Sequence, residues 1–120
     1  MTNSRRKGKD GELEFAKVCR EEGYEARRGQ QYHGLEGQDV VGLPHTLIEV
    51  KRRNKLNLHD AVRQAKRDAE TQEKEIAIVA HRKDGEKQWL VTMTAEDFFK
   101  VFREFTSGKY LEEREREGSG

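Results

Sequence analysis

The apolar residues of this chain form short segments whose spacing changes from that of helices to that of strands and back. Apolar side chains three or four residues apart predict helices over residues 9–22, over 58–72, and from Thr94 to about residue 105. Alternating or continuous apolar runs predict strands over residues 24–28, 38–41, 46–51, 75–80 and 87–93. The order helix, three strands, helix, two strands, helix is typical of an α/β domain with a mixed central sheet.

Turn and cap residues support these boundaries. Gly23 follows the first helical segment and favours a helix C-cap. The turn at residues 42–45 contains the only proline and predicts a hairpin between the strands on either side of it. Asn57 is a suitable N-cap for the second helix, and Thr94 with Asp97 resembles a capping box in which Asp replaces the usual Glu or Gln.

The two ends of the chain lack the apolar pattern. Residues 1–8 are polar and basic and are expected to be flexible, residues 9–106 are expected to form a single domain, and residues 107–120 form a charged tail. For the tail, a frayed helix and a disordered segment both remain open.

Four large apolar residues share one face of the last helix: Phe98, Val101, Phe102 and Phe105. We expect this stripe to pack into the core, whereas an exposed stripe would be a candidate dimer surface.

Charge is abundant but balanced along this chain of 120 residues, with 24 basic and 23 acidic residues and a net charge of +1. The total therefore does not indicate nucleic-acid binding, whereas the distribution of basic residues is compatible with it. Basic clusters occur near the N-terminus and after the strand at 46–51: Arg6, Lys7, Lys9, Arg52, Arg53 and Lys55. We expect them to contact DNA phosphates, although a solvated charged surface would explain any one run equally well.

Cys19 is the only cysteine, so no intrachain disulfide can form and a reducing compartment is expected. Its place among apolar positions of a helix predicts a buried structural thiol. The sequence has neither a membrane-length apolar run nor the apolar stretch of a signal peptide. We therefore expect a soluble cytoplasmic protein associated with the nucleoid and not with a membrane.

Asp39, Glu49 and Lys51 carry the strongest chemical signal in the sequence. Side chains alternate between the two faces of a strand, so Glu49 and Lys51 project to one face of the strand at 46–51. Asp39 lies near the start of the preceding strand, and a tight hairpin can bring its carboxylate close to Glu49. A half-buried strand explains an isolated Glu-x-Lys equally well, and it is the addition of Asp39 that favours a chemical role.

Two neighbouring carboxylates repel each other unless a cation neutralises them. Mg²⁺ prefers carboxylate, carbonyl and water oxygens, and we expect Mn²⁺ to substitute for it. Such a site permits phosphodiester hydrolysis, because the metal polarises the phosphoryl group and acidifies a bound water. Lys51 is a compact positive charge that can orient the attacking water or help to deprotonate it.

These residues resemble the PD-(D/E)xK nuclease superfamily, and more narrowly the archaeal-type Holliday junction resolvases with their virus-encoded relatives. The resemblance spans residues 6–93 and begins with Arg6-Lys7-Gly8 followed by Gly11-Glu12-Leu13-Glu14-Phe15. It implies a restriction-endonuclease-like fold and a catalytic set that consists of Glu12, Asp39, Glu49 and Lys51. The metal ligands that it implies are Glu12, Asp39, Glu49 and the backbone carbonyl of Val50. Glu14 competes with Glu12 for the position of the helix ligand.

The resemblance also implies roles for two residues outside this core. Arg28 matches an arginine that contacts the DNA backbone or supports the site, and Gln64 matches a polar helix residue aimed at the active site. Members of the family act as symmetric dimers, which implies a homodimer that makes paired nicks in a four-way junction.

The chain departs from the family at two places. Gln38 precedes Asp39 where the superfamily name has a proline, and the loop at 29–37 lacks the serine of the archaeal enzymes. That loop offers Gln30, Gln31 and Tyr32, which could contact or stack on unpaired bases at a branch point. His33 could bind phosphate or be an ordinary surface residue.

Three functions remain open at this stage. The first is a Mg²⁺-dependent endonuclease that resolves four-way junctions. The second is a repair or restriction-type nuclease that acts on linear, flapped or damaged DNA. The third is a DNA-binding module without turnover, which the joint presence of Asp39, Glu49 and Lys51 disfavours.

Overall fold

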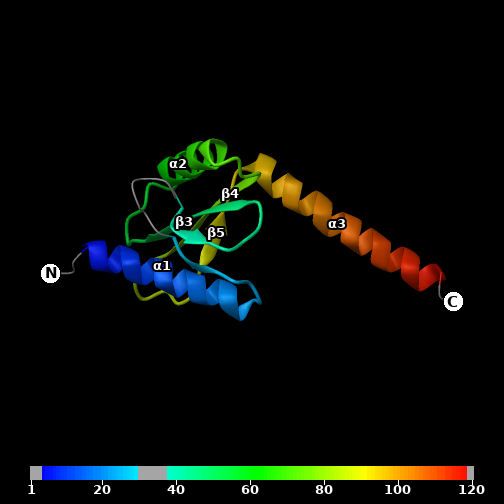
Figure 1. Cartoon of the computed structure of the whole chain (residues 1–120), viewed down its shortest axis with the longest axis horizontal. Helices are drawn as coiled ribbons and strands as arrows, with labels where there is room; N and C mark the ends of the chain where they lie inside the picture. The colour runs from blue at the N-terminus through cyan, green and yellow to red at the C-terminus, as the bar shows by residue number, and fades with distance from the viewer. Residues whose placement is uncertain (1–3, 30–37, 119–120) are drawn as a thin grey trace.

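The computed structural model describes residues 4–29 and 38–118, and Figure 1 shows the arrangement of their helices and strands. The elements follow the predicted order: α1 (Ser4–Glu21), β1 (Arg27–Arg28), β2 (Val40–Val41), β3 (Thr46–Arg52), α2 (Leu58–Thr71), β4 (Ile76–Arg82), β5 (Leu90–Thr92) and α3 (Ala95–Gly118). The α/β class, with five strands in a mixed sheet and three helices, is therefore confirmed.

The strands form one mixed sheet in the order β1-β2-β3-β4-β5. The central pair, β3 and β4, is parallel over its whole length, from Thr46 opposite Ile76 to Arg52 opposite Arg82. The other three pairs are antiparallel, and β2 and β3 form the predicted hairpin with Val40 opposite Ile48. Because parallel strands need a crossover, α2 connects β3 to β4 and covers one face of the sheet.

The sheet lies between α1 and α2 in Figure 1, with a separate apolar layer on each face. Alternation along β3 sends Ile48 and Val50 into the layer that contains Phe15 of α1, whereas Leu47 packs under α2. The buried face of α2 consists of small side chains at helical spacing: Ala61, Ala65 and Ala69. Glu49 and Lys51 follow Leu47 at every second position, so they belong to the face of β3 that α2 covers.

Two glycines permit close approach of chain segments around the site. A Cβ atom at Gly11 would lie 3.1 Å from the Cβ of Arg52, so its absence lets α1 pack closely against the end of β3. Gly42 has a φ of 123°, and a Cβ atom there would lie 2.5 Å from the Cα of Ala26. These contacts hold α1 and β1 against the hairpin that carries the predicted acids.

Both outer helices are longer than the apolar pattern predicts. The structure includes residues 4–8 in α1, although the sequence predicts a flexible segment there, and α3 continues through most of the charged tail to Gly118. Arg6 pairs with Asp10 one turn later, and Lys7 forms an ion pair with Asp84 of the loop after β4. Neither contact involves apolar periodicity, so a prediction from that periodicity places the start of α1 too late.

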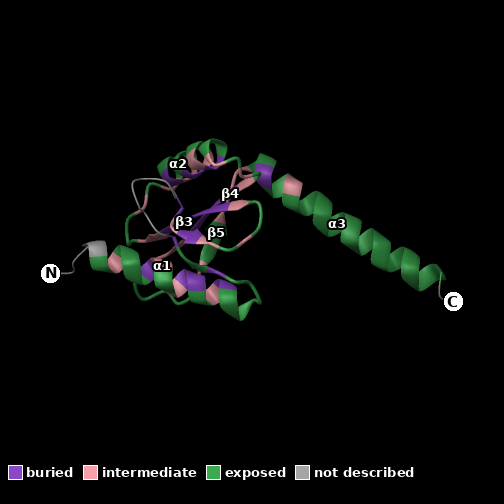
Figure 2. Cartoon of the chain, viewed as in Figure 1, coloured by how far each residue is buried: buried purple, intermediate pink, exposed green. Residues whose placement is uncertain are grey.

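The phenylalanine stripe of α3 is exposed, and the expectation that it belongs to the core is wrong. Figure 2 shows α3 leaving the body of the protein with an almost entirely exposed surface. Phe98, Phe102 and Phe105 are 47%, 43% and 57% exposed. Leu13, an apolar residue of α1, is likewise 46% exposed. Periodicity identified an apolar face of α3, but it cannot show whether another element covers that face.

Asp97 attaches α3 to the sheet. Thr94 caps the helix, because its Oγ1 accepts a hydrogen bond from the Asp97 N–H at 3.1 Å. The Asp97 carboxylate accepts hydrogen bonds from the N–H of Ala77 and from Lys66 at 3.1 Å each, and Lys100 lies 3.4 Å away. The capping residue is thus confirmed, while Asp97 makes long-range contacts that a local capping motif does not predict.

None of the helices in residues 4–29 and 38–118 combines the length and the apolar character that a membrane crossing requires.

Candidate active site

Asp39 is held against β3 by backbone hydrogen bonds. Its N–H donates to the carbonyl of Ile48 at 3.0 Å, and its carboxylate Oδ2 accepts from the N–H of Val50 at 2.8 Å. The hairpin therefore fixes the Asp39 carboxylate beside the segment Ile48–Val50. The tight turn at 42–45 makes this arrangement possible, because it returns the chain directly into β3.

Glu49 is 2% exposed and lies within hydrogen-bonding contact of the carboxyl groups of Asp39 and Asp68. Burial, followed by the nearby charge of Asp39 and the contacts with both acids, raises the pKa of Glu49 to about 9, against the opposing charge of Lys51. In the absence of a bound metal ion, the Glu49 carboxyl therefore keeps its proton at neutral pH. The structure thus brings Asp39 and Glu49 into contact, and Lys51 is close enough for its charge to act on Glu49.

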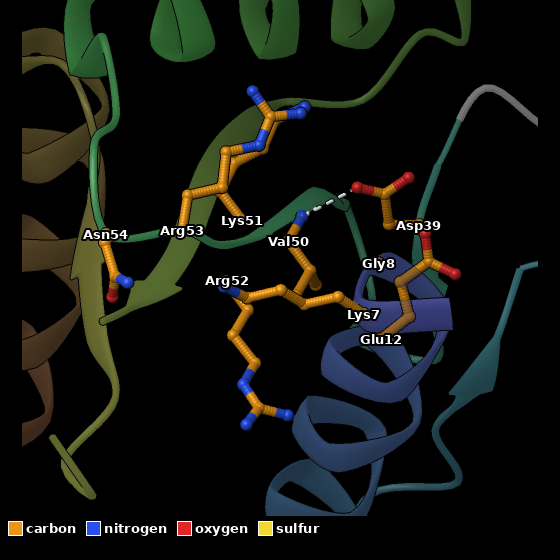
Figure 3. Close-up of a pocket in the computed structure, with 9 residues that line it drawn as sticks. All are labelled: Lys7, Gly8, Glu12, Asp39, Val50, Lys51, Arg52, Arg53 and Asn54. Carbon is orange, nitrogen blue, oxygen red and sulfur yellow. Dashed lines mark hydrogen bonds between the residues drawn. The ribbon is translucent and has the colours of Figure 1, made fainter. Parts of the chain in front are cut away.

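Glu12, rather than its competitor Glu14, is the helix acid that faces this group. Burial raises the pKa of Glu12 and Asp39 adds to the rise, whereas Arg28 and Lys51 oppose it. Arg28 also forms an ion pair with Glu12, so its side chain helps to position this acid. Figure 3 shows the carboxyl groups of Glu12 and Asp39 on the same side of β3.

The side chain of Glu14 makes a different set of contacts. Its carboxylate lies 3.3 Å from Arg52 and 2.6 Å from Arg82, and Arg52 also contacts Asp84 at 3.2 Å. These ion pairs connect α1 to the ends of β3 and β4. The two glutamates differ because residues two apart on a helix point about 200° away from each other around its axis.

A cavity of about 480 Å³ opens beside the acids, as Figure 3 shows. Its lining contains two of the acids together with basic side chains from α1 and from the end of β3: Lys7, Gly8, Glu12, Asp39, Val50, Lys51, Arg52, Arg53 and Asn54. Buried Glu49 is not part of this lining, but it contacts Asp39, which is. An open cavity in which acids and cations meet suits a phosphate together with a divalent cation.

The donor chemistry fits Mg²⁺ in part. Asp39 and Glu49 supply two oxygen ligands in contact, and Asp39 is close enough to Glu12 for its charge to raise the pKa of Glu12. Among the described residues, however, no three His, Cys, Asp or Glu side chains form a metal-binding group by themselves. Mg²⁺ retains several waters and uses one or two carboxylates, so this donor set resembles what the ion usually takes from a protein. Val50 lines the cavity, where its carbonyl would be a further candidate ligand.

The residues expected to bind DNA fall into four groups. Arg6, Lys7, Arg28 and Arg52 form ion pairs with acids of the protein. Arg53 and Gln64 line a second cavity, described below, while Lys9 and Lys55 are exposed and line neither cavity. The predicted loop contacts of Gln30, Gln31, Tyr32 and His33 lie outside the described residues.

Asp68 is a site residue that the sequence analysis missed. It lies on α2 one turn after Gln64 and one turn before Gln72, whose Oε1 accepts a hydrogen bond from Gln38 at 3.0 Å. This row of polar residues faces the β2–β3 hairpin beside the alanines of α2. The four-residue spacing next to the apolar stripe was visible in the sequence, but charged helix residues usually face solvent, so the spacing alone did not single out Asp68.

No model of a known protein family matches the sequence, and the comparison with curated proteins also gives no match.

Proposed function

We propose that this protein is a Mg²⁺-dependent endonuclease of the PD-(D/E)xK type, with the restriction-endonuclease-like fold, and that it cuts four-way DNA junctions. The observation that carries the proposal is the contact between Asp39 and buried Glu49 beside Lys51, at the edge of a cavity lined with basic residues. A buried carboxyl that contacts two other acids is destabilised in its charged form, and a functional cation would relieve this.

Asp39 and Glu49 would hold the ion, with Glu12 as a further ligand from α1. When bound, Mg²⁺ supplies Lewis-acid polarisation of a phosphodiester and lowers the pKa of water. Lys51 lines both cavities and is positioned to hold the attacking water by hydrogen bonding. Its charge also stabilises the negative charge that develops on the phosphate oxygens during attack. No side-chain nucleophile is required by this arrangement.

Pairing of two copies would fit a substrate with two strands to cut. A four-way junction is nearly two-fold symmetric, so a symmetric dimer places one site on each of two opposed strands. The exposed apolar side chains of α3 are a candidate surface for the second copy, because large exposed apolar patches usually mark contacts with other molecules.

The test compares cleavage of a labelled four-way junction with that of a linear duplex of matched sequence, in Mg²⁺ and in chelator. We expect paired nicks in the junction alone, and only with Mg²⁺. Asp39→Asn, Glu49→Gln and Lys51→Ala should each lower the cleavage rate by a factor of at least about 1,000, because these groups act on the ion and the water. Binding of the junction in chelator should stay close to that of the wild type.

Lys17→Ala is the matched control for Lys51→Ala, because Lys17 is an exposed lysine of α1 that lines neither cavity. Cleavage by Lys51→Ala at the control rate would refute the assignment. Equal cutting of duplex and junction would favour a repair or restriction-type nuclease. Binding without any cutting would favour a DNA-binding module.

A further inference from the structure

A second cavity, of about 260 Å³, lies on the other side of β3 against α2. Three of its lining residues are cations, namely Lys51 and Arg53 from the end of β3 and Arg67 from α2. The one acid in the lining is Asp60, which forms an ion pair with Arg63. The cavity therefore presents an excess of positive charge.

The arginines of this cavity differ from those around the first one. Arg28, Arg52 and Arg82 are each paired with a glutamate or an aspartate of the protein. Among the described residues, neither Arg53 nor Arg67 has such a partner for its side chain. Cations that share one small cavity repel each other, and an anion between them removes this repulsion. A guanidinium group can also bind two phosphate oxygens at once.

The two cavities are neighbours, because Lys51 and Arg53 line both. Basic side chains therefore continue from the carboxylates, across the end of β3, to α2. A polynucleotide carries its phosphates at short, regular intervals, so a strand whose cut phosphate lies in the first cavity has its next phosphate nearby. Gln64 adds an amide that can donate to a phosphate oxygen from the same helix face as Arg67.

We infer that Arg67, together with Arg53 and Gln64, binds the backbone phosphate that neighbours the cleaved one, so that α2 sets the position of the strand in the active site. The inference rests on the proposed nuclease function. Contacts of this kind carry no base information, so the second cavity would position the strand whatever its sequence.

The first experiment measures DNA affinity in chelator as a function of salt, for the wild type, Arg67→Gln and Arg103→Gln. Arg103 is the matched control, because it is an exposed arginine of α3 that, within the described part of the chain, lines neither cavity and forms no ion pair with a residue that lines one. We expect Arg67→Gln to reduce the slope of log K against log salt by about 0.9, and Arg103→Gln to leave it unchanged. Arg67→Lys should recover most of the slope, since it restores the charge.

The second experiment replaces single phosphates of the cut strand by neutral methylphosphonates. One substitution next to the cleavage site should weaken binding by the wild type about threefold or more at moderate salt, yet have no further effect on Arg67→Gln. Additive losses at every position would overturn the inference, as would equal behaviour of Arg67→Gln and Arg103→Gln.

The outcomes separate this inference from the proposed function. Cutting by the wild type without any specific effect of Arg67 would retain the nuclease and refute the second phosphate site. DNA binding that depends on Arg67 without any cutting in Mg²⁺ would retain the site and refute the nuclease. Absence of DNA binding by the wild type would refute both.

Discussion

Two carboxyl groups are buried to a similar degree in this protein, but their surroundings are opposite. Asp97, at the start of α3, is 0% exposed and receives hydrogen bonds from a backbone N–H and from Lys66, with Lys100 nearby. Glu49, in the middle of β3, is 2% exposed and contacts the acids Asp39 and Asp68. One region supplies positive partners for a buried acid, and the other gathers acids around it.

Their pKa values move in opposite directions for this reason. Burial acts to raise the pKa of Asp97, but the Ala77 N–H and Lys66 outweigh it, and the pKa falls below its ordinary value. Burial raises the pKa of Glu49 as well, and Asp39 adds to the rise. A buried acid whose partners neutralise it stabilises the fold. A buried acid whose neighbours are themselves acids is typical of a functional site.

The largest effect should appear in the pH dependence of stability in chelator. Glu49 titrates near 4.5 when it is unfolded and near 9 in the folded state. Its contribution to stability is complete below pH 4.5 and is lost as the pH rises from there through about 9, because over this range the unfolded state has released the proton that the folded state still holds. Urea unfolding at several pH values should show this decline in the wild type and a flatter profile in Glu49→Gln. An identical decline in both proteins would show that Glu49 is not the cause of the pH dependence.

Asp97→Ala should lower the free energy of unfolding by about 3 kcal/mol at neutral pH, because it leaves the Ala77 N–H and Lys66 without their partner. The contribution of Asp97 to stability changes with pH in the opposite direction to that of Glu49. It is present above pH 3.8 and is lost as the pH falls through the lowered pKa of Asp97. Glu49→Gln serves as the control at a site of equal burial, and it should cost much less. A similar loss from both substitutions, measured by urea unfolding, would contradict the distinction drawn between the two acids.

Addition of Mg²⁺ should stabilise the wild type by up to about 2.7 kcal/mol at a concentration 100 times Kd, because an ion held by the proposed site would bind only the folded state. The melting temperature in Mg²⁺ and in chelator measures this effect. Asp39→Asn should remove most of it, whereas Asp84→Asn, which changes an acid of the loop after β4, should retain it. An equal shift in all three proteins would indicate non-specific ion binding.

The smallest effect separates the two glutamates of α1. Glu14→Gln should reduce stability by about 1 kcal/mol through loss of its contacts with Arg52 and Arg82, and should leave metal binding intact. Glu12→Gln should weaken metal binding, as seen in the melting shift with Mg²⁺, with little change in stability in chelator. The reverse result would restore Glu14 as the helix ligand.

The sequence was sufficient to predict the parts of the fold that local pattern determines. Alternation along residues 46–51 placed Glu49 and Lys51 on one face, and the turn at 42–45 implied that Asp39 would return to them. The alanine stripe of α2 was likewise visible, because its three buried residues follow helical spacing.

Contacts between distant residues decided the rest. Lys7 and Asp84, 77 residues apart, attach the first turns of α1, and Glu14 meets Arg82 across 68 residues. Local periodicity contains no information about such pairs. It also could not show that the apolar face of α3 is uncovered, or that Asp68 is turned toward Glu49.

The full-length parallel register of β3 and β4 has a consequence for local opening of the sheet. These two strands pair over seven residues each and belong, with α2, to one continuous segment, residues 46–82. β1, β2 and β5 contain two or three residues each, so they have few backbone pairs to hold them. Local opening of β1 or β5 would therefore leave the strand that carries Glu49 and Lys51 paired along its whole length with β4.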